Sequence, residues 1–109
     1  MVETLDLDEA SNLLDQVRVE NEADLAHARE VLTRAAEDGS ATGNLTDEVT
    51  VARYMEADAA SILKEVDEAM GRITSGTYGR CEVCGGGIVA ERLRVRPYIK
   101  TCISCASKK

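Results

Sequence analysis

The sequence predicts a mainly α-helical protein, in which a long antiparallel helical hairpin (coiled coil) precedes a small four-cysteine finger with a short C-terminal helix. Two segments carry apolar residues at steps of three and four, the spacing of one face of a helix. All four cysteines lie in the last third of the chain. Only 3% of the 109 residues are aromatic, so we do not expect a large self-contained core.

The first helix is predicted over about residues 13–36, and the second extends to Ile73 from a cap at Thr46 or Asp47. The first apolar stripe consists of Leu14, Val17, Leu25, Ala28, Leu32 and Ala35, and the second of Ala52, Met55, Ala59, Ile62, Val66, Ala69 and Ile73. Residues 37–44 contain two glycines and small polar residues, which is typical of a loop. Helices joined in this way can bury their stripes against each other, which predicts the hairpin.

These patterns divide the chain into three predicted parts. Residues 1–10 form an N-terminal segment that we expect to be flexible, residues 11–75 form the hairpin with a tip loop near 37–47, and residues 76–109 form the finger. The charge follows the same division. Residues 1–75 carry 6 Lys and Arg against 18 Asp and Glu, net −12, whereas residues 76–109 carry 7 against 2, net +5. The acidic part would be repelled by nucleic acid and attracted to basic surfaces of other proteins.

The four cysteines have the spacing C-x2-C-x17-C-x2-C, formed by Cys81, Cys84, Cys102 and Cys105. Two such pairs about 15–20 residues apart are typical of a zinc site, and here they predict one structural Zn²⁺ in a zinc-ribbon-like finger. Two disulfides are the alternative, but the acidic start of the chain lacks the features of a secretory signal. No apolar run is long enough to span a membrane, so we expect a cytoplasmic protein without membrane contact.

No catalytic constellation is evident, so we do not predict an enzyme. The only histidine, His27, is predicted to lie on the surface of the first helix. Four thiolates would leave the metal without an open coordination position for chemistry. Between the cysteine pairs, Arg92, Arg94 and Arg96 form a basic stretch that either contacts phosphate or an acidic protein surface, or simply faces water.

The finger resembles a known family. Residues 76–85 read GTYGRCEVCG, and Ile88, Arg92-Leu93, Pro97 and residues 102–105 (CISC) follow at matching positions. Together with the helix that leads into the finger, this pattern is similar to the DksA/TraR family of four-cysteine zinc-finger transcription factors. The resemblance covers about residues 62–106, whereas the hairpin agrees in architecture only.

The resemblance implies that the protein binds the β and β′ subunits of bacterial RNA polymerase directly. In that family the coiled coil enters the secondary channel and its acidic tip lies near the active site, while the zinc module lies against the outer rim. The protein is then expected to be a monomer without sequence-specific DNA binding. The partner-binding residues expected on this basis are Asp38, Asp47, Glu48, Thr50, Ala52, Arg92, Arg94 and Arg96.

The tip departs from the family pattern Asp-x-x-Asp-x-Ala, because Thr50 stands where the second aspartate would be. Asp38, on the other side of the loop, is a candidate to replace that aspartate in space. Two other classes of function stay open. GATA-type DNA-binding fingers share the cysteine spacing, although this chain ends soon after Cys105, with only two lysines at its end. A zinc-stapled adaptor that pairs its hairpin with helices of another protein is the other class.

Overall fold

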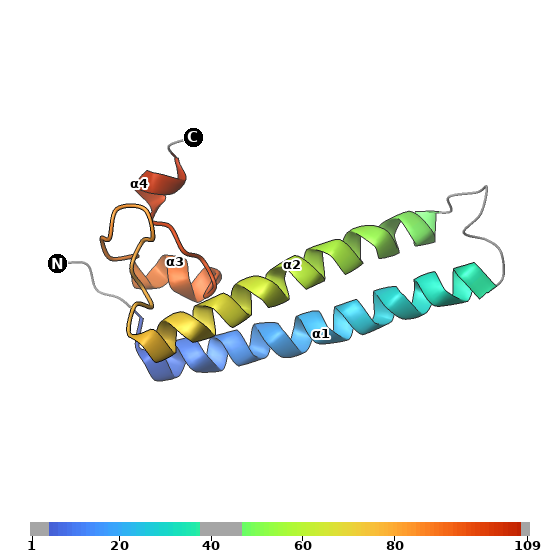
Figure 1. Cartoon of the computed structure of the whole chain (residues 1–109), viewed down its shortest axis with the longest axis horizontal. Coiled ribbons are helices and arrows are strands. Elements are labelled where there is room, and N and C mark those ends of the chain that lie inside the picture. The colour runs from blue at the N-terminus through green and yellow to red at the C-terminus, as the bar shows by residue number, and fades with distance from the viewer. Residues whose placement is uncertain (1–4, 38–46, 108–109) are drawn as a thin grey trace. The chain divides into compact units, whose positions relative to one another are not determined.

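The computed structural model describes residues 5–37 and 47–107 (Figure 1). Four helices follow one another along the chain: α1 (Leu7–Glu37), α2 (Asp47–Ser75), α3 (Ala90–Val95) and α4 (Ile103–Ala106). Within the described ranges no strand is present, and a single antiparallel bridge joins Arg80 and Gly87. The mainly α-helical fold class predicted from the sequence is therefore confirmed. The predicted tip loop, with Asp38, lies outside the described residues apart from its two ends.

The helix α1 begins at Leu7, before the start near residue 13 that the apolar spacing predicts. Asp8 and Glu9 in its first turn interact favourably with the positive end of the helix dipole. The N–H of Ala10 donates to the Asp6 carbonyl over 2.9 Å. Leu5 and Ala10 are 4% and 0% exposed. Leu5 and Ala10 therefore contribute apolar burial on both sides of the first turn.

The described chain forms two compact units, and both long helices contribute to each. The first, called the hairpin unit here, is Arg18–Lys64. In it α1 and α2 run antiparallel and bury small residues along their facing stripes (Figure 1). The buried side chains of this unit are those of Ala28, Ala35, Val49, Ala52 and Ala59. An exposed ion pair also joins the two helices, from Arg29 Nε to Glu56 Oε2 over 3.4 Å.

The second unit, called the finger unit here, consists of Met1–Val17 and Glu65–Lys109. It takes in the start of α1 and the end of α2, so the compact division does not fall at residue 75. Its core contains the larger buried side chains, namely Leu5, Leu14, Val66, Tyr78, Ile88 and Leu93, with Ala10 and Ala69 between them. An ion pair between Glu9 Oε2 and Arg94 Nε, 2.9 Å apart, adds a contact between α1 and α3.

No helix among the described residues combines the length and the apolar character that a membrane span requires.

Replacing Leu14 by alanine tests the core of the finger unit. Leu14 is 0% exposed, so the variant loses apolar burial and leaves a cavity, and we expect the free energy of unfolding to fall by about 2–4 kcal/mol. Leu7→Ala is the matched control, because Leu7 is 47% exposed and its removal should change stability by less than about 1 kcal/mol. Urea unfolding of the zinc-loaded chains measures both values, and equal losses would contradict this core.

Candidate metal centre

The end of α2 directs the chain into the finger. Gly76 follows the last helical residue with a φ of 82°, a backbone conformation that side-chain-bearing residues rarely adopt. The N–H of Thr77 donates to the Arg72 carbonyl over 2.9 Å, and the N–H of Gly76 donates to the Ile73 carbonyl over 3.3 Å. These two bonds form a Schellman motif, which satisfies the last carbonyls of the helix and reverses the chain. The first cysteine pair therefore follows a fixed helix end.

A tight turn presents the first cysteine pair. Gly85, with a φ of 76°, donates its N–H to the Cys81 carbonyl over 2.9 Å. The N–H of Val83 lies 3.4 Å from Cys81 Sγ, and the N–H of Gly86 lies 3.4 Å from Cys84 Sγ. A Cβ at Gly86 would stand 3.4 Å from Cys84 Sγ, a tight contact.

The second cysteine pair is placed by α4. Cys102 precedes the first residue of this helix, and its carbonyl accepts the N–H of Ala106 over 2.9 Å. Cys105 lies within the helix, one turn from Cys102. One helical turn therefore directs both sulfurs of the second pair to the same side, because residues three apart share a helix face.

The four sulfurs come together at one point. The sulfur atoms of Cys81, Cys84, Cys102 and Cys105 all lie within 4.8 Å of one another. Cys84 Sγ and Cys102 Sγ are 3.8 Å apart. Zinc–sulfur bonds of about 2.3 Å in a tetrahedron place neighbouring sulfurs about 3.8 Å apart. The donor set and its spacing therefore fit a single four-coordinate Zn²⁺, which the chain uses as a structural metal.

The four cysteine thiols differ in acidity. The pKa of Cys81 is lowered to about 6, first by the backbone N–H of Cys84 and then by those of Cys102 and Val83. The pKa of Cys105 is raised to about 12, chiefly because its thiol donates to the sulfur of Cys81 and then to that of Cys102. Four adjacent thiolates repel one another, so one proton is held strongly. A divalent cation removes this repulsion and allows all four sulfurs to ionise.

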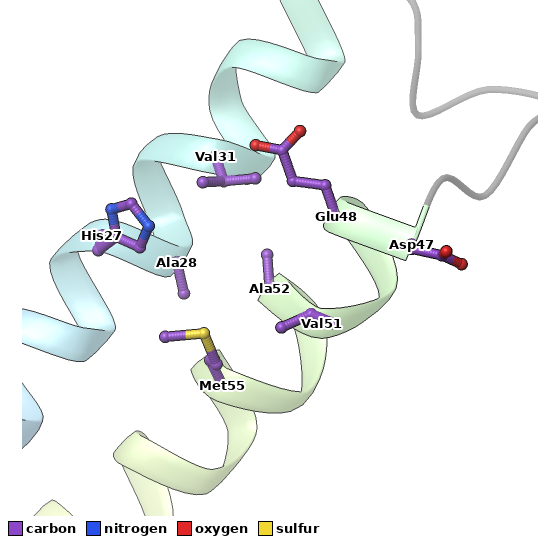
Figure 2. Close-up of a pocket in the computed structure, with 8 residues that line it drawn as sticks. All are labelled: His27, Ala28, Val31, Asp47, Glu48, Val51, Ala52 and Met55. Atoms are coloured by element: carbon purple, nitrogen blue, oxygen red, sulfur yellow. The ribbon is translucent and has the colours of Figure 1, made fainter.

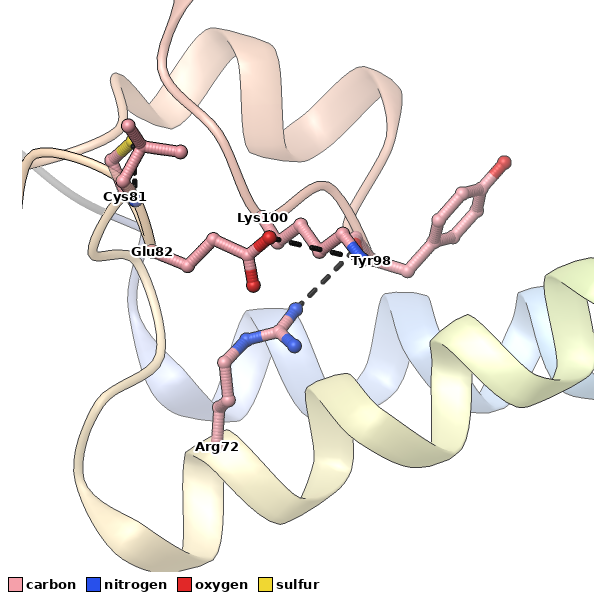
Figure 3. Close-up of polar contacts among 6 residues, drawn as sticks. Arg72, Cys81, Glu82, Tyr98 and Lys100 are labelled. Atoms are coloured by element: carbon pink, nitrogen blue, oxygen red, sulfur yellow. Dashed lines mark hydrogen bonds and ion pairs between the residues drawn. The ribbon is translucent and has the colours of Figure 1, made fainter. Parts of the chain in front are cut away.

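Hydrogen bonds to backbone carbonyls connect the finger to α2 and join segments within the finger. The buried hydroxyl of Tyr78 donates to the Pro97 carbonyl over 2.7 Å. Arg72 Nη2 in α2 donates to the Tyr98 carbonyl over 3.3 Å, as Figure 3 shows. The backbone N–H of Glu82 donates to the Lys100 carbonyl over 2.9 Å, and the side chains of these two residues lie 3.9 Å apart as an ion pair. These bonds hold the segment between α3 and α4 against the first cysteine turn.

The three arginines of the basic stretch differ in their surroundings. Arg92 is half-buried and its Nε donates to the Thr101 carbonyl over 3.0 Å. Arg94 forms the ion pair with Glu9. The side chain of Arg96 is exposed. Two of the three residues therefore contribute to the fold of the finger unit, and Arg96 is the one most open to a partner.

The residues expected near the tip lie at the start of α2 in the hairpin unit. Asp47 and Glu48 are exposed, Thr50 is half-buried and Ala52 is 3% exposed. Figure 2 shows Glu48 extending toward α1, while Asp47 points away from it. They border a hollow of about 260 Å³. Ala52 thus serves helix packing, and the two carboxylates are the groups available to a partner.

Comparisons with known proteins agree with this geometry. The sequence model of one protein family, the prokaryotic DksA/TraR C4-type zinc finger, matches residues 76–109. This match covers the four-cysteine finger and leaves the two long helices outside it. The predicted resemblance is thereby confirmed. Because the matching family is a C4-type zinc finger, the four clustered cysteines are the zinc ligands.

Nearly the whole chain is similar in structure to a solved protein. The transcription factor DksA2 from Pseudomonas aeruginosa matches with a TM-score of 0.74 and 24% identity, over 94% of this chain and 81% of that one. A likeness at this level shows the fold, which is the DksA fold. An uncharacterized protein from Aquifex aeolicus is 44% identical over 46 residues. That match covers 42% of this chain and 32% of the relative's length.

Metal analysis and substitution of a cysteine test the metal centre. We expect about one zinc per chain by metal analysis. Cys102→Ser should lower the zinc content and unfold the finger, because metal binding and folding are coupled. Ser104→Ala is the control, since Ser104 lies between the two cysteines and is exposed. A zinc-free chain whose finger amides remained protected from exchange would contradict a structural metal.

Replacing Tyr78 by phenylalanine tests the bond to Pro97. Loss of the hydroxyl leaves a buried carbonyl unpaired, so we expect the free energy of unfolding to fall by about 1–2 kcal/mol. Burial raises the pKa of Tyr78 from its ordinary value of 10 to about 12. The unfolded chain therefore ionises first, and stability should decrease as the pH rises through this interval. Denaturant unfolding should show a shallower decrease for Tyr78→Phe than for the unmodified chain, and parallel curves would contradict it.

Proposed function

We propose that the chain is a cytoplasmic transcription regulator of the DksA/TraR type that binds bacterial RNA polymerase directly. The hairpin enters the secondary channel, with its end near the active site, and the contacts are with the β and β′ subunits. The observation that carries the proposal is the combination of a DksA/TraR finger with the DksA fold over 94% of the chain. A monomer with one structural zinc is sufficient for this function.

The charge of the hairpin unit supports the proposal. Residues 18–64 contain 5 Lys and Arg against 10 Asp and Glu, net −5. Such a surface is attracted to basic protein walls and repelled by the phosphates of DNA. Asp47 and Glu48 are exposed at the first turn of α2, where they are free to contact a cationic group of the polymerase.

The regulator would act without catalysing a reaction. A bound hairpin that contacts one conformation of the polymerase better than another shifts the population toward that conformation. The four sulfurs of the finger fill the coordination shell of a zinc ion. The metal therefore contributes to the fold and leaves the regulatory contacts to the side chains of the hairpin.

A DNA-binding finger is less well supported by the surroundings of the basic residues. Arg92 donates to the Thr101 carbonyl and Arg94 pairs with Glu9. A phosphate contact by either side chain would compete with these interactions. The polymerase proposal needs neither arginine to be released.

Asp38→Asn combined with Asp47→Asn tests the contacts of the hairpin end. We expect the double variant to lose its effect on transcription by purified polymerase, because two charges are removed while the packing residues stay in place. Binding to the β and β′ subunits in a pull-down should change by less than about threefold, since the loss of a few charges at the rim of an interface costs little affinity. Asp58→Asn, an exposed position elsewhere on α2, is the control.

Transcription by the double variant, together with binding assays of the unmodified chain to polymerase and to duplex DNA, separates the three classes of function. Unchanged transcription by the double variant would mean that these aspartates are not the active contacts. Tight binding to duplex DNA without binding to polymerase would favour the DNA-binding class. Binding to neither would favour an adaptor.

A further inference from the structure

The finger unit contains a groove between α3 and α4 that the zinc centre does not use. Its volume is about 500 Å³, and its aliphatic lining consists of Val89, Val95, Ile99 and Ile103. Val95 is 86% exposed, Ile103 59% and Val89 41%. Three large aliphatic side chains exposed around one groove are unusual for so small a module, and such patches commonly mark interaction sites.

The charged lining of the groove favours an acidic partner. Arg92 and Arg96 lie one helical turn apart along it, and Glu91 is its one acidic residue. Arg92 is held in place because its Nε donates to the Thr101 carbonyl. Arg96 is exposed, so its guanidinium is open to a carboxylate of a partner. The finger segment as a whole carries 7 basic residues against 2 acidic ones, which adds attraction at longer range.

We propose that this groove is a docking site for an acidic amphipathic helix of a protein partner. Aliphatic side chains spaced three and four apart on that helix would contact Val89, Val95 and Ile103. Its carboxylates would pair with Arg96, and a basic residue of the helix would face Glu91. The site lies on the finger unit and does not depend on the hairpin residues of the proposed function. The peptide test changes no hairpin residue, so its failure and the failure of the hairpin test are distinguishable.

Nuclear magnetic resonance titration of the full, zinc-loaded chain tests the proposal. The probe is a synthetic helical peptide of about 18 residues with leucine on one face and glutamate on the other. We expect its addition to shift the amide signals of residues 89–103. A peptide with lysine in place of every glutamate should cause little or no shift. Absence of shifts with the glutamate peptide, or equal binding of the lysine peptide, would overturn the proposal.

Substitutions at exposed positions identify the groove without unfolding the finger. Val95→Ser combined with Ile103→Ser should weaken the glutamate peptide about tenfold, since two apolar contacts are lost. Arg96→Glu should weaken it as well and should reduce the preference over the lysine peptide. Val83→Ser is the matched control, because Val83 is 69% exposed on the same finger and lies outside the groove. An equal effect of Val83→Ser would overturn the assignment.

The oligomeric state separates a foreign partner from a second copy of the chain. Sedimentation of the unmodified chain should show no dimer that Val95→Ser disrupts. A concentration-dependent dimer that this substitution abolishes would assign the groove to a second copy and overturn the acidic partner.

Discussion

The convergence of four sulfur atoms is the constraint on which the finger depends. Cys81 and Cys84 come from a turn built on Gly85, and Cys102 and Cys105 come from one turn of α4. Neither helix of the finger is long enough to be stable alone, and isolated helices of this length are marginal in water. A metal that joins the two pairs removes conformational freedom from the intervening residues and fixes both turns together. The bonds of Tyr78 and Arg72 then position the segment between them.

The hairpin unit is held together differently. Its buried positions are mainly alanines, such as Ala28, Ala52 and Ala59. Small side chains allow two helices to approach closely, but each contributes little apolar area, so the stabilisation per residue is low. Two of these alanines, Ala28 and Ala52, line the hollow beside Met55. The charged outer faces keep such a hairpin soluble and give it the acidic surface on which the proposed function relies.

The sequence predicts those features that depend on spacing. The cysteine pairs and the apolar stripes of α1 and α2 follow from periodicity and ligand chemistry, and the stripe residue Leu14 is fully buried. Spacing carries no information on which polar groups meet across the fold. The Tyr78 hydroxyl and the Arg92 guanidinium both end on carbonyls distant in the chain, at Pro97 and Thr101. Equally, the burial of Leu5 before α1 is a tertiary contact, which no local helix pattern reveals.

The pairing of Glu9 with Arg94 joins positions 85 residues apart. This contact forms only when the beginning and the end of the described chain come together, which requires a long loop to close. During synthesis on the ribosome, α1 is made long before the residues that complete its neighbours. The contact between Glu9 and Arg94 therefore forms only after the finger has been synthesised.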